Sequence, residues 1–150
     1  MPRFLVVANQ TLGGEQLTAK LDELSTPEPP TLRLMVPVTD TEGFQQWDYP
    51  PIDRVLPDAH KLAHALAEGR LEHELARLRR AGVPASGEVV DADPVEHVKK
   101  ALAEEQYDGV VVSTLPHRLS RWQLMNLPHR ITRASNVPVT QVVGAAGPSI

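Results

Sequence analysis

The residues most able to do chemistry lie in a basic segment, residues 115–133, which follows a run of valines. This segment carries four arginines, two histidines and no acidic residue. Arg118 and Arg121, together with His117, could bind an anion through charge-assisted hydrogen bonds, because guanidinium groups match the geometry of a phosphate. Solvation of a surface turn, or contact with acidic residues of a second subunit, would explain the same charges. Both interpretations stay open from the sequence.

The charge of the chain is uneven along its length. The whole sequence has a net charge of −4, but every acidic residue lies at or before Asp108. Residues 1–108 hold 11 Lys+Arg against 19 Asp+Glu, a net charge of −8, and residues 109–150 hold four Arg, a net charge of +4. A basic C-terminal quarter on an acidic body indicates a small anionic ligand or a self-complementary contact. Nucleic acid is not an expected partner, because it requires a basic surface over a whole face.

The composition is typical of a soluble globular protein. The chain is 41% hydrophobic and 23% charged, and it has no cysteine for disulfides or thiolate chemistry. No apolar stretch approaches the roughly 20 residues that cross a bilayer, and the N-terminal apolar run is too short for a signal peptide. We therefore expect one cytoplasmic domain that covers residues 1–150 and makes no membrane contact.

An asparagine and two glycines follow the first apolar run. Asn9 comes directly after that run, and Gly13 and Gly14 precede the first expected helix, where their backbone N–H groups could contact a phosphate. The two glycines match neither a Walker loop nor a Rossmann fingerprint. The alternative is a tight turn between a strand and a helix.

Histidine and hydroxyl side chains supply further candidates. His60 and His64 have the i, i+4 spacing of a helical metal pair, but no Glu follows His60 and no third ligand is evident, so a solvent-facing pair is favoured. Ser113 and Thr114 lie near His117 in the sequence. No acid follows in that loop to orient a base, and we expect no catalytic residue and no metal ligand.

Aromatic side chains gather in two loops. Trp122 could stack on a base or cap a pocket, but packing beneath its loop is favoured because a tryptophan buries so much area. Phe44, Trp47 and Tyr49 lie in a long loop, residues 39–57, where they could form a lid or anchor the loop to the edge of a sheet.

An alternation of apolar strands and amphipathic helices must position these candidates. The expected strands are residues 4–8, 32–38, 86–92, 107–114 and 137–143. The expected helices are residues 15–24, residues 58–81, a helix that begins at Asp93-Pro94, and residues 126–135. Residues 107–114 are apolar without alternation, which is typical of a parallel strand covered on both faces.

The helix expected over residues 58–81 has leucines at helical spacing that predict its buried side. These are Leu62, Leu66, Leu71, Leu75 and Leu78. An irregularity is expected at Gly69, and Gly82 is expected to end the helix.

The two later helices have recognisable starts. Asp93 and Glu96 predict a capping box around Pro94, which suits the first turn. Asn126 is expected to cap the last helix, so that His129 and Arg130 fall near its positive end.

Strands that alternate with helices in this way predict an α/β fold. We expect a three-layer sandwich, with a five-stranded parallel sheet of order 3-2-1-4-5 and helices on both faces. Such sheets bind ligands beyond the carboxyl ends of the strands, where the winding reverses, here between the first and fourth strands. The expected ligand-binding residues are Asn9, Gly13, Gly14, Val38, Ser113, Thr114, His117, Arg118, Arg121 and Asn126.

Nearly the whole chain resembles the universal stress protein family. The resemblance is carried by LVVAN near the start, DADPVEHVKKALAEEQYDGVVVST in the middle and LSRWQLMNLPHRITRASNVPVTQVV near the end. Ala92-Asp93-Pro94 resembles the family's Gly-Asp-Pro turn before a helix, and Pro138-Val139 resembles its closing strand. The resemblance implies an adenine-nucleotide-hydrolase-like fold and a homodimer formed through the last strand, Val137 to Val143.

The resemblance also locates a phosphate-binding loop that differs in this chain. In nucleotide-binding members, the fourth strand leads into a glycine, two residues, a glycine, nine residues, a glycine and then Ser or Thr. The matching positions here hold Val112, Leu115, Met125 and Asn126, and Asn9 stands where the family has an Asp that touches the ribose. Glycine lets the backbone approach a phosphate closely, so these residues disfavour ATP binding of the usual kind.

The resemblance implies a regulatory role in a stress response. The expected ligand is a small anion, which is either phosphate or a nucleotide such as ATP or AMP in an altered pose. One alternative is a nucleotide hydrolase that uses Arg118 and Arg121. The other is a dimeric scaffold in which Leu115, Trp122 and Met125 fill the former pocket.

Overall fold

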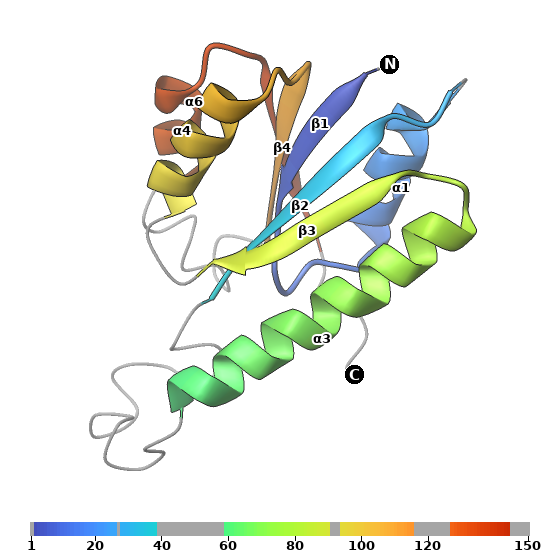
Figure 1. Ribbon diagram of the computed structural model, residues 1–150, viewed down its shortest axis with the longest axis vertical. Helices are drawn as coiled ribbons and strands as arrows, with labels where there is room; N and C mark the ends of the chain where they lie inside the picture. Colours follow the sequence, from blue (N-terminus) through green and yellow to red (C-terminus); the bar gives the residue numbers. More distant parts are fainter. Residues whose placement is uncertain (1, 27, 39–58, 91–93, 116–126, 145–150) are drawn as a thin grey trace.

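The chain folds into a parallel sheet with helices on both sides (Figure 1). The computed structural model describes residues 2–26, 28–38, 59–90, 94–115 and 127–144. Labelled as in Figure 1, the elements are β1 (Arg3–Val7), α1 (Glu15–Leu24), β2 (Thr31–Pro37), α3 (Ala59–Arg80), β3 (Ala85–Val90), α4 (Pro94–Glu104), β4 (Gly109–Thr114), α6 (Leu127–Ala134) and β5 (Val139–Val143). Each lies within about two residues of its expected bounds.

The strand order is β3-β2-β1-β4-β5, and every neighbouring pair is parallel, which confirms the predicted topology. Val7, the last residue of β1, pairs with Met35 of β2 on one side and with Val112 of β4 on the other. The chain therefore reverses its winding between β1 and β4. The carboxyl ends of these two strands lie side by side, as a binding site at this point requires.

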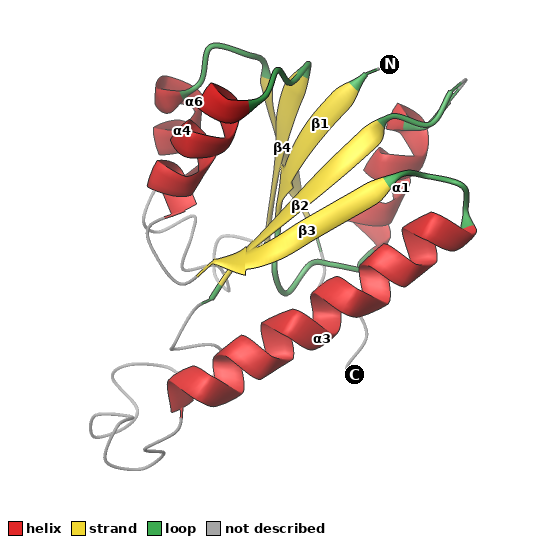
Figure 2. Cartoon of the chain, viewed as in Figure 1, coloured by secondary structure: helices red, strands yellow, loops and turns green. Residues whose placement is uncertain are grey.

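Helices cover the two faces of the sheet in pairs, with α1 and α3 on one side and α4 and α6 on the other (Figure 2). Successive residues of a strand point to opposite faces, so Leu5 and Val7 belong to the core under α4 and α6, and Val6 belongs to the core under α1 and α3. All six residues of β4 are buried, which confirms that this strand is covered on both faces.

The buried side of α3 differs from the predicted leucine stripe. Leu62 is 52% exposed and Leu66 is 38% exposed, so the prediction was wrong for these two leucines. The side chains that α3 buries are Ala63, Ala67, Leu71, Glu74 and Leu78. These positions follow the helical repeat, with spacings of three and four residues. The helix is also continuous through Gly69, where an irregularity was expected.

The ends of the helices agree with the sequence signals where the structure describes them. Gly82 follows α3 with φ +82°, a left-handed conformation that glycine adopts without strain, and Val83 donates its N–H to the carbonyl of Leu78. Pro94 is the first residue of α4. Asp93 and Asn126 lie outside the described residues, so their capping roles stay predictions.

Candidate functional site

Buried polar side chains gather at the carboxyl ends of β1 and β4. Asn9, Thr11, Ser113 and Thr114 are each 1–2% exposed. Across the residues described here, Glu74 is the only other buried polar or charged residue. Burial of polar groups is unfavourable unless they are hydrogen-bonded, so this cluster marks a position where the fold maintains polar atoms at some cost. It coincides with the point at which the sheet reverses its winding.

A hydroxyl pair joins the two strand ends. Ser113 Oγ donates to Thr11 Oγ1 across 2.7 Å, and both side chains are buried. Thr114, the last residue of β4, accepts a hydrogen bond from Gln141 Nε2 at 3.4 Å, and its carbonyl accepts one from the Gly144 N–H at 3.0 Å. The hydroxyl of Ser113 therefore joins the end of β4 to the loop after β1.

Asn9 is held by two hydrogen bonds that fix the orientation of its amide. Its Nδ2 donates to the carbonyl of Pro37 at 2.8 Å, and its Oδ1 accepts from Arg70 Nη1 at 2.9 Å. Asn9 was expected to contact a ligand directly, and that role stays a prediction. In this structure the amide joins the end of β1 to the end of β2 and to α3.

Arg70 was missed from the sequence. It lies on α3, between Ala67 and Glu74 of the buried side, and is only partly buried. The sequence could have indicated Arg70 by its position at the edge of the buried side of α3. A long polar side chain at such a position can reach the end of a neighbouring strand. Following the helical repeat rather than the leucines would have identified it.

The glycines after β1 form a tight turn into α1. Gly13 has φ +80°, and Gly14 is the N-cap residue of α1. The N–H of Gly14 donates to the carbonyl of Thr11 at 2.8 Å. This bond supports the alternative of a strand-to-helix turn, and phosphate contact by the two glycines stays a prediction.

Val38, the remaining described candidate, follows β2. Its N–H donates to the carbonyl of Val90 at 3.0 Å, and its side chain packs against the core under α1 and α3. The hydrogen bond from Val38 thus joins the ends of β2 and β3. Val38 directly follows Pro37, whose carbonyl accepts the hydrogen bond from Asn9.

Several candidates lie outside the described residues, and their roles stay predictions. They are Phe44, Trp47, Tyr49, His117, Arg118, Arg121, Trp122, Met125 and Asn126. The helix that follows the basic segment is described. Leu127 and Ile131 of α6 are buried, His129 is exposed and Arg130 is partly buried.

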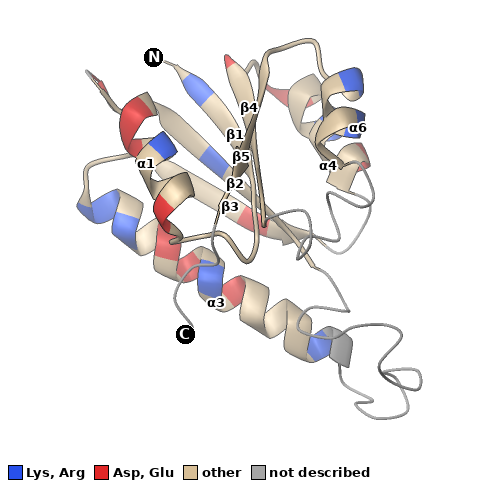
Figure 3. Ribbon diagram, turned by 180° about the vertical axis from the view of Figure 1, so that it is seen from behind, with Lys and Arg blue, Asp and Glu red and all other residues tan. Residues whose placement is uncertain are grey.

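Charge differs between α6 and α1, which lie on opposite faces of the sheet. In Figure 3, α6 shows basic positions and no acidic one, and α1 shows more acidic than basic positions. The difference does not extend to the whole faces, because α3, on the same side as α1, carries five basic and three acidic residues.

The histidine pair expected on α3 is described only in part. His64 Nε2 lies 2.6 Å from Glu68 Oε1, one turn further along α3. No group of three or more metal-ligating side chains occurs among the residues that the structure describes, and the side chain of His60 is outside them.

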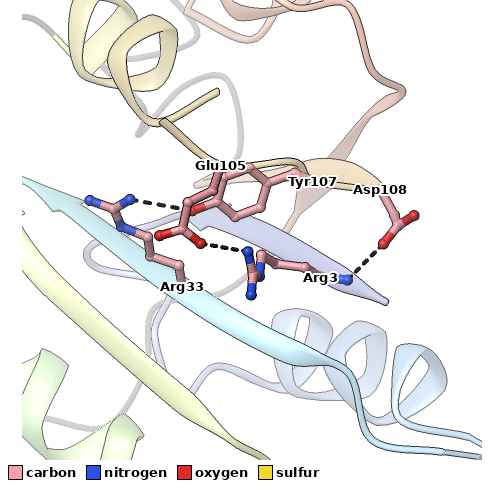
Figure 4. A network of polar contacts seen from close by, with 5 residues as sticks. All are labelled: Arg3, Arg33, Glu105, Tyr107 and Asp108. Carbon is pink, nitrogen blue, oxygen red and sulfur yellow. Dashed lines mark hydrogen bonds and ion pairs between the residues drawn. The ribbon is translucent and has the colours of Figure 1, made fainter. Parts of the chain in front are cut away.

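A second polar network lies at the opposite, amino end of the sheet (Figure 4). Arg3 Nη1 contacts Glu105 Oε2 at 2.6 Å, and the Arg3 N–H donates to Asp108 Oδ2 at 2.7 Å. Arg33 Nη1 donates to the hydroxyl of Tyr107 at 3.3 Å. This hydrogen bond raises the pKa of the Arg33 guanidinium above its ordinary value; burial opposes the increase, and Glu88 adds to it. The network joins β1, β2 and β4 at the end away from the candidate site.

Comparison with solved structures identifies the class of fold. A protein of the universal stress protein family from Arabidopsis thaliana, with AMP bound, has a TM-score of 0.61 at 13% identity, covering 97% of this chain and 94% of that chain. A universal stress protein in complex with cAMP has a TM-score of 0.55 at 18% identity, covering 94% and 96%. A protein of the same family from Burkholderia pseudomallei has a TM-score of 0.52 at 21% identity, covering 93% of each chain. No protein-family model and no curated protein sequence matches the chain.

The chain is therefore an α/β protein with a parallel sheet that reverses its winding between β1 and β4. Its fold is that of the universal stress proteins. Within the described residues, no helix is both long and apolar enough to span a membrane.

Proposed function

We propose that residues 1–150 form one regulatory, universal-stress-like domain that binds a small anionic ligand of the nucleotide class beside β1 and β4. The observation that carries this proposal is the cluster of buried polar side chains at the carboxyl ends of these strands, Asn9, Thr11, Ser113 and Thr114. Open α/β sheets bind their ligands at such a point. Structural neighbours with bound AMP and cAMP support a nucleotide as the ligand to test first. A cytoplasmic location stays a prediction.

Ligand binding is expected to raise the melting temperature of the chain, because a ligand that binds the native state stabilises it by mass action. Thermal shift measurements would use AMP, cAMP, ATP, phosphate and sulfate, with adenosine as the uncharged control. The double variant Arg118→Ala, Arg121→Ala is expected to lose the shift caused by the anions. Arg133→Ala, which removes an exposed arginine of α6, is the matched control and should keep it. A shift that persists unchanged in the double variant would exclude these two arginines from the site.

A scaffold without a ligand is the second candidate, and one feature of the site favours it. The side-chain oxygen of Asn9 and the hydroxyl of Ser113 both make hydrogen bonds within the protein. A site whose polar groups all have internal partners can be stable when empty. Absence of a thermal shift with any of the nucleotides or anions would support this candidate.

We also propose that two copies of the chain associate through β5. This strand is at an edge of the sheet, and Val143 on it is 46% exposed. An exposed edge strand offers unpaired backbone groups and apolar side chains to a second copy. Val143→Lys is therefore expected to convert a dimer to a monomer in analytical ultracentrifugation, because it places like charges at the contact. Thr132→Lys, on the exposed side of α6, is the control. A dimer that survives Val143→Lys, or a monomeric parent protein, would contradict this arrangement.

A further inference from the structure

The sheet has two edges, with β5 at one and β3 at the other. An edge strand presents backbone N–H and C=O groups that can pair with another chain. If both edges of each molecule were open, β5 of one copy could pair with β3 of the next, and the sheet would extend from copy to copy without closing. Association that stops at a dimer through β5 therefore requires that β3 be kept from pairing.

The backbone carbonyl of Ala85, the first residue of β3, faces the free edge. The N–H groups of Leu32 and Val38 donate to the carbonyls of Pro84 and Val90, at 2.9 and 3.0 Å. Alternate residues of a parallel strand direct their backbone groups to the same neighbour, so Pro84 and Val90 belong to the set that faces β2. The residues of β3 that face outward are Ala85, Gly87 and Val89.

Arg79 binds the outward carbonyl of Ala85. Its Nε and Nη2 both donate to this oxygen, at 3.3 and 3.0 Å. The arginine lies in the last turn of α3, the helix that precedes β3 in the chain. A strand that paired at Ala85 would have to displace both hydrogen bonds, together with a guanidinium group that keeps its charge at any ordinary pH.

The same helix packs closely against the next outward position, Gly87. In Figure 1, α3 runs along β3, and a Cβ atom at Gly87 would lie 2.7 Å from Leu71 Cδ1. Leu71 is buried, so its side chain is held against the edge strand. A helix packed on an edge strand is one of the ways in which proteins protect such an edge from pairing.

We propose that Arg79, together with the packing of α3, prevents β5 of a second copy from pairing with β3 and so confines self-association to the β5 edge. The two edges differ as this requires, because Thr140, Gln141 and Val143 of β5 are exposed. The choice of β5 as the excluded partner rests on the proposed association through that strand. The inference assigns the control of assembly to an arginine at the amino end of the sheet, away from the candidate ligand site.

Sedimentation velocity of the full chain over a range of protein concentrations tests this role. Arg79→Ala is expected to form larger species than the parent does, with an association constant about 10-fold higher, the change expected when one backbone hydrogen-bonding group becomes available. Arg79→Gln, which cannot form the two-pronged contact, should associate as Arg79→Ala does. Arg80→Ala removes the same charge from the neighbouring exposed position, and this matched control should sediment like the parent.

A double variant tests the partner strand. Adding Val143→Lys to Arg79→Ala should abolish the larger species, because it places a charge on β5. Larger species that persist in the double variant would overturn β5 as the partner.

Two results with the single variants would overturn the role of Arg79. One is sedimentation of Arg79→Ala and Arg79→Gln like the parent at every concentration. The other is equal association in Arg79→Ala and Arg80→Ala, which would assign the effect to net charge. A monomeric parent would contradict the proposed β5 dimer but not this inference, which then predicts association in Arg79→Ala alone among the parent and the two alanine variants.

Discussion

Arg77→Ala is expected to lower the free energy of unfolding by about 3 kcal/mol, because it leaves a buried carboxylate without its partner. The side chain of Glu74 is 1% exposed, and the side chain of Arg77 is 29% exposed. Both oxygens of Glu74 contact the guanidinium, and these hydrogen bonds raise the pKa of Arg77 above its ordinary value, with Asp22 of α1 adding to the increase. This expected loss lies at the lower end of the range for a broken buried ion pair, because water can enter the space that the arginine side chain leaves.

Urea denaturation followed by far-UV circular dichroism measures this loss. Arg80→Ala, which removes an exposed arginine from the same helix, is the control and should change the free energy of unfolding by less than about 0.5 kcal/mol. Glu74→Gln should lose less than Arg77→Ala, because the amide oxygen still accepts a hydrogen bond from Arg77 and no charge is left buried. Equal stabilities of the Arg77→Ala and Arg80→Ala variants would contradict a structural role for the pair.

Asn9→Ala is expected to lower the free energy of unfolding by about 2 kcal/mol, the cost of leaving buried polar groups without partners. The substitution removes the donor to the Pro37 carbonyl and the acceptor for Arg70 Nη1. Gln106→Ala, which truncates an exposed amide beyond the end of α4, is the control. Thermal and urea denaturation of the two variants measure the difference. A stability like that of the control would mean that Asn9 does not hold the ends of β1, β2 and α3 together.

The fold was predictable because apolar runs mark the central strands β1 and β4, and strands alternate with helices along the chain. The valines of β4 have no polar alternation, and the structure buries them on both faces. That pattern and the strand–helix alternation fix a parallel sheet almost without reference to individual contacts. The helix ends at Gly82 and Pro94 were predictable as well, because they depend on the local backbone conformation and not on distant partners.

The errors on α3 have a common physical cause. Leucine was taken as the sign of burial, but α3 turns Ala63 and Ala67 toward the core, so Leu62 and Leu66, each one residue earlier, lie off the buried side and stay exposed. Glu74 is buried because the helical repeat puts it between Leu71 and Leu78, and Arg77 one turn away neutralises it. A charge at a core position can be recognised only when its partner is known.

The position of the candidate site was predictable from the sequence, but the hydrogen bonds within it were not. Asn9, Ser113 and Thr114 were expected at the carboxyl ends of neighbouring strands, and the structure buries all three there. The contact between Arg70 and Asn9 spans 61 residues and depends on how α3 lies against the sheet, which no local pattern specifies. Ligand contact by the candidate residues stays a prediction.

Calorimetric titration of the folded chain with AMP tests the central claim most directly. The account predicts saturable binding at one site per chain, with an affinity that falls as salt is added, since exposed charges are screened. A protein that is folded by circular dichroism and gives no binding signal with AMP, cAMP or phosphate would contradict the account and leave the ligand-free scaffold as the better description.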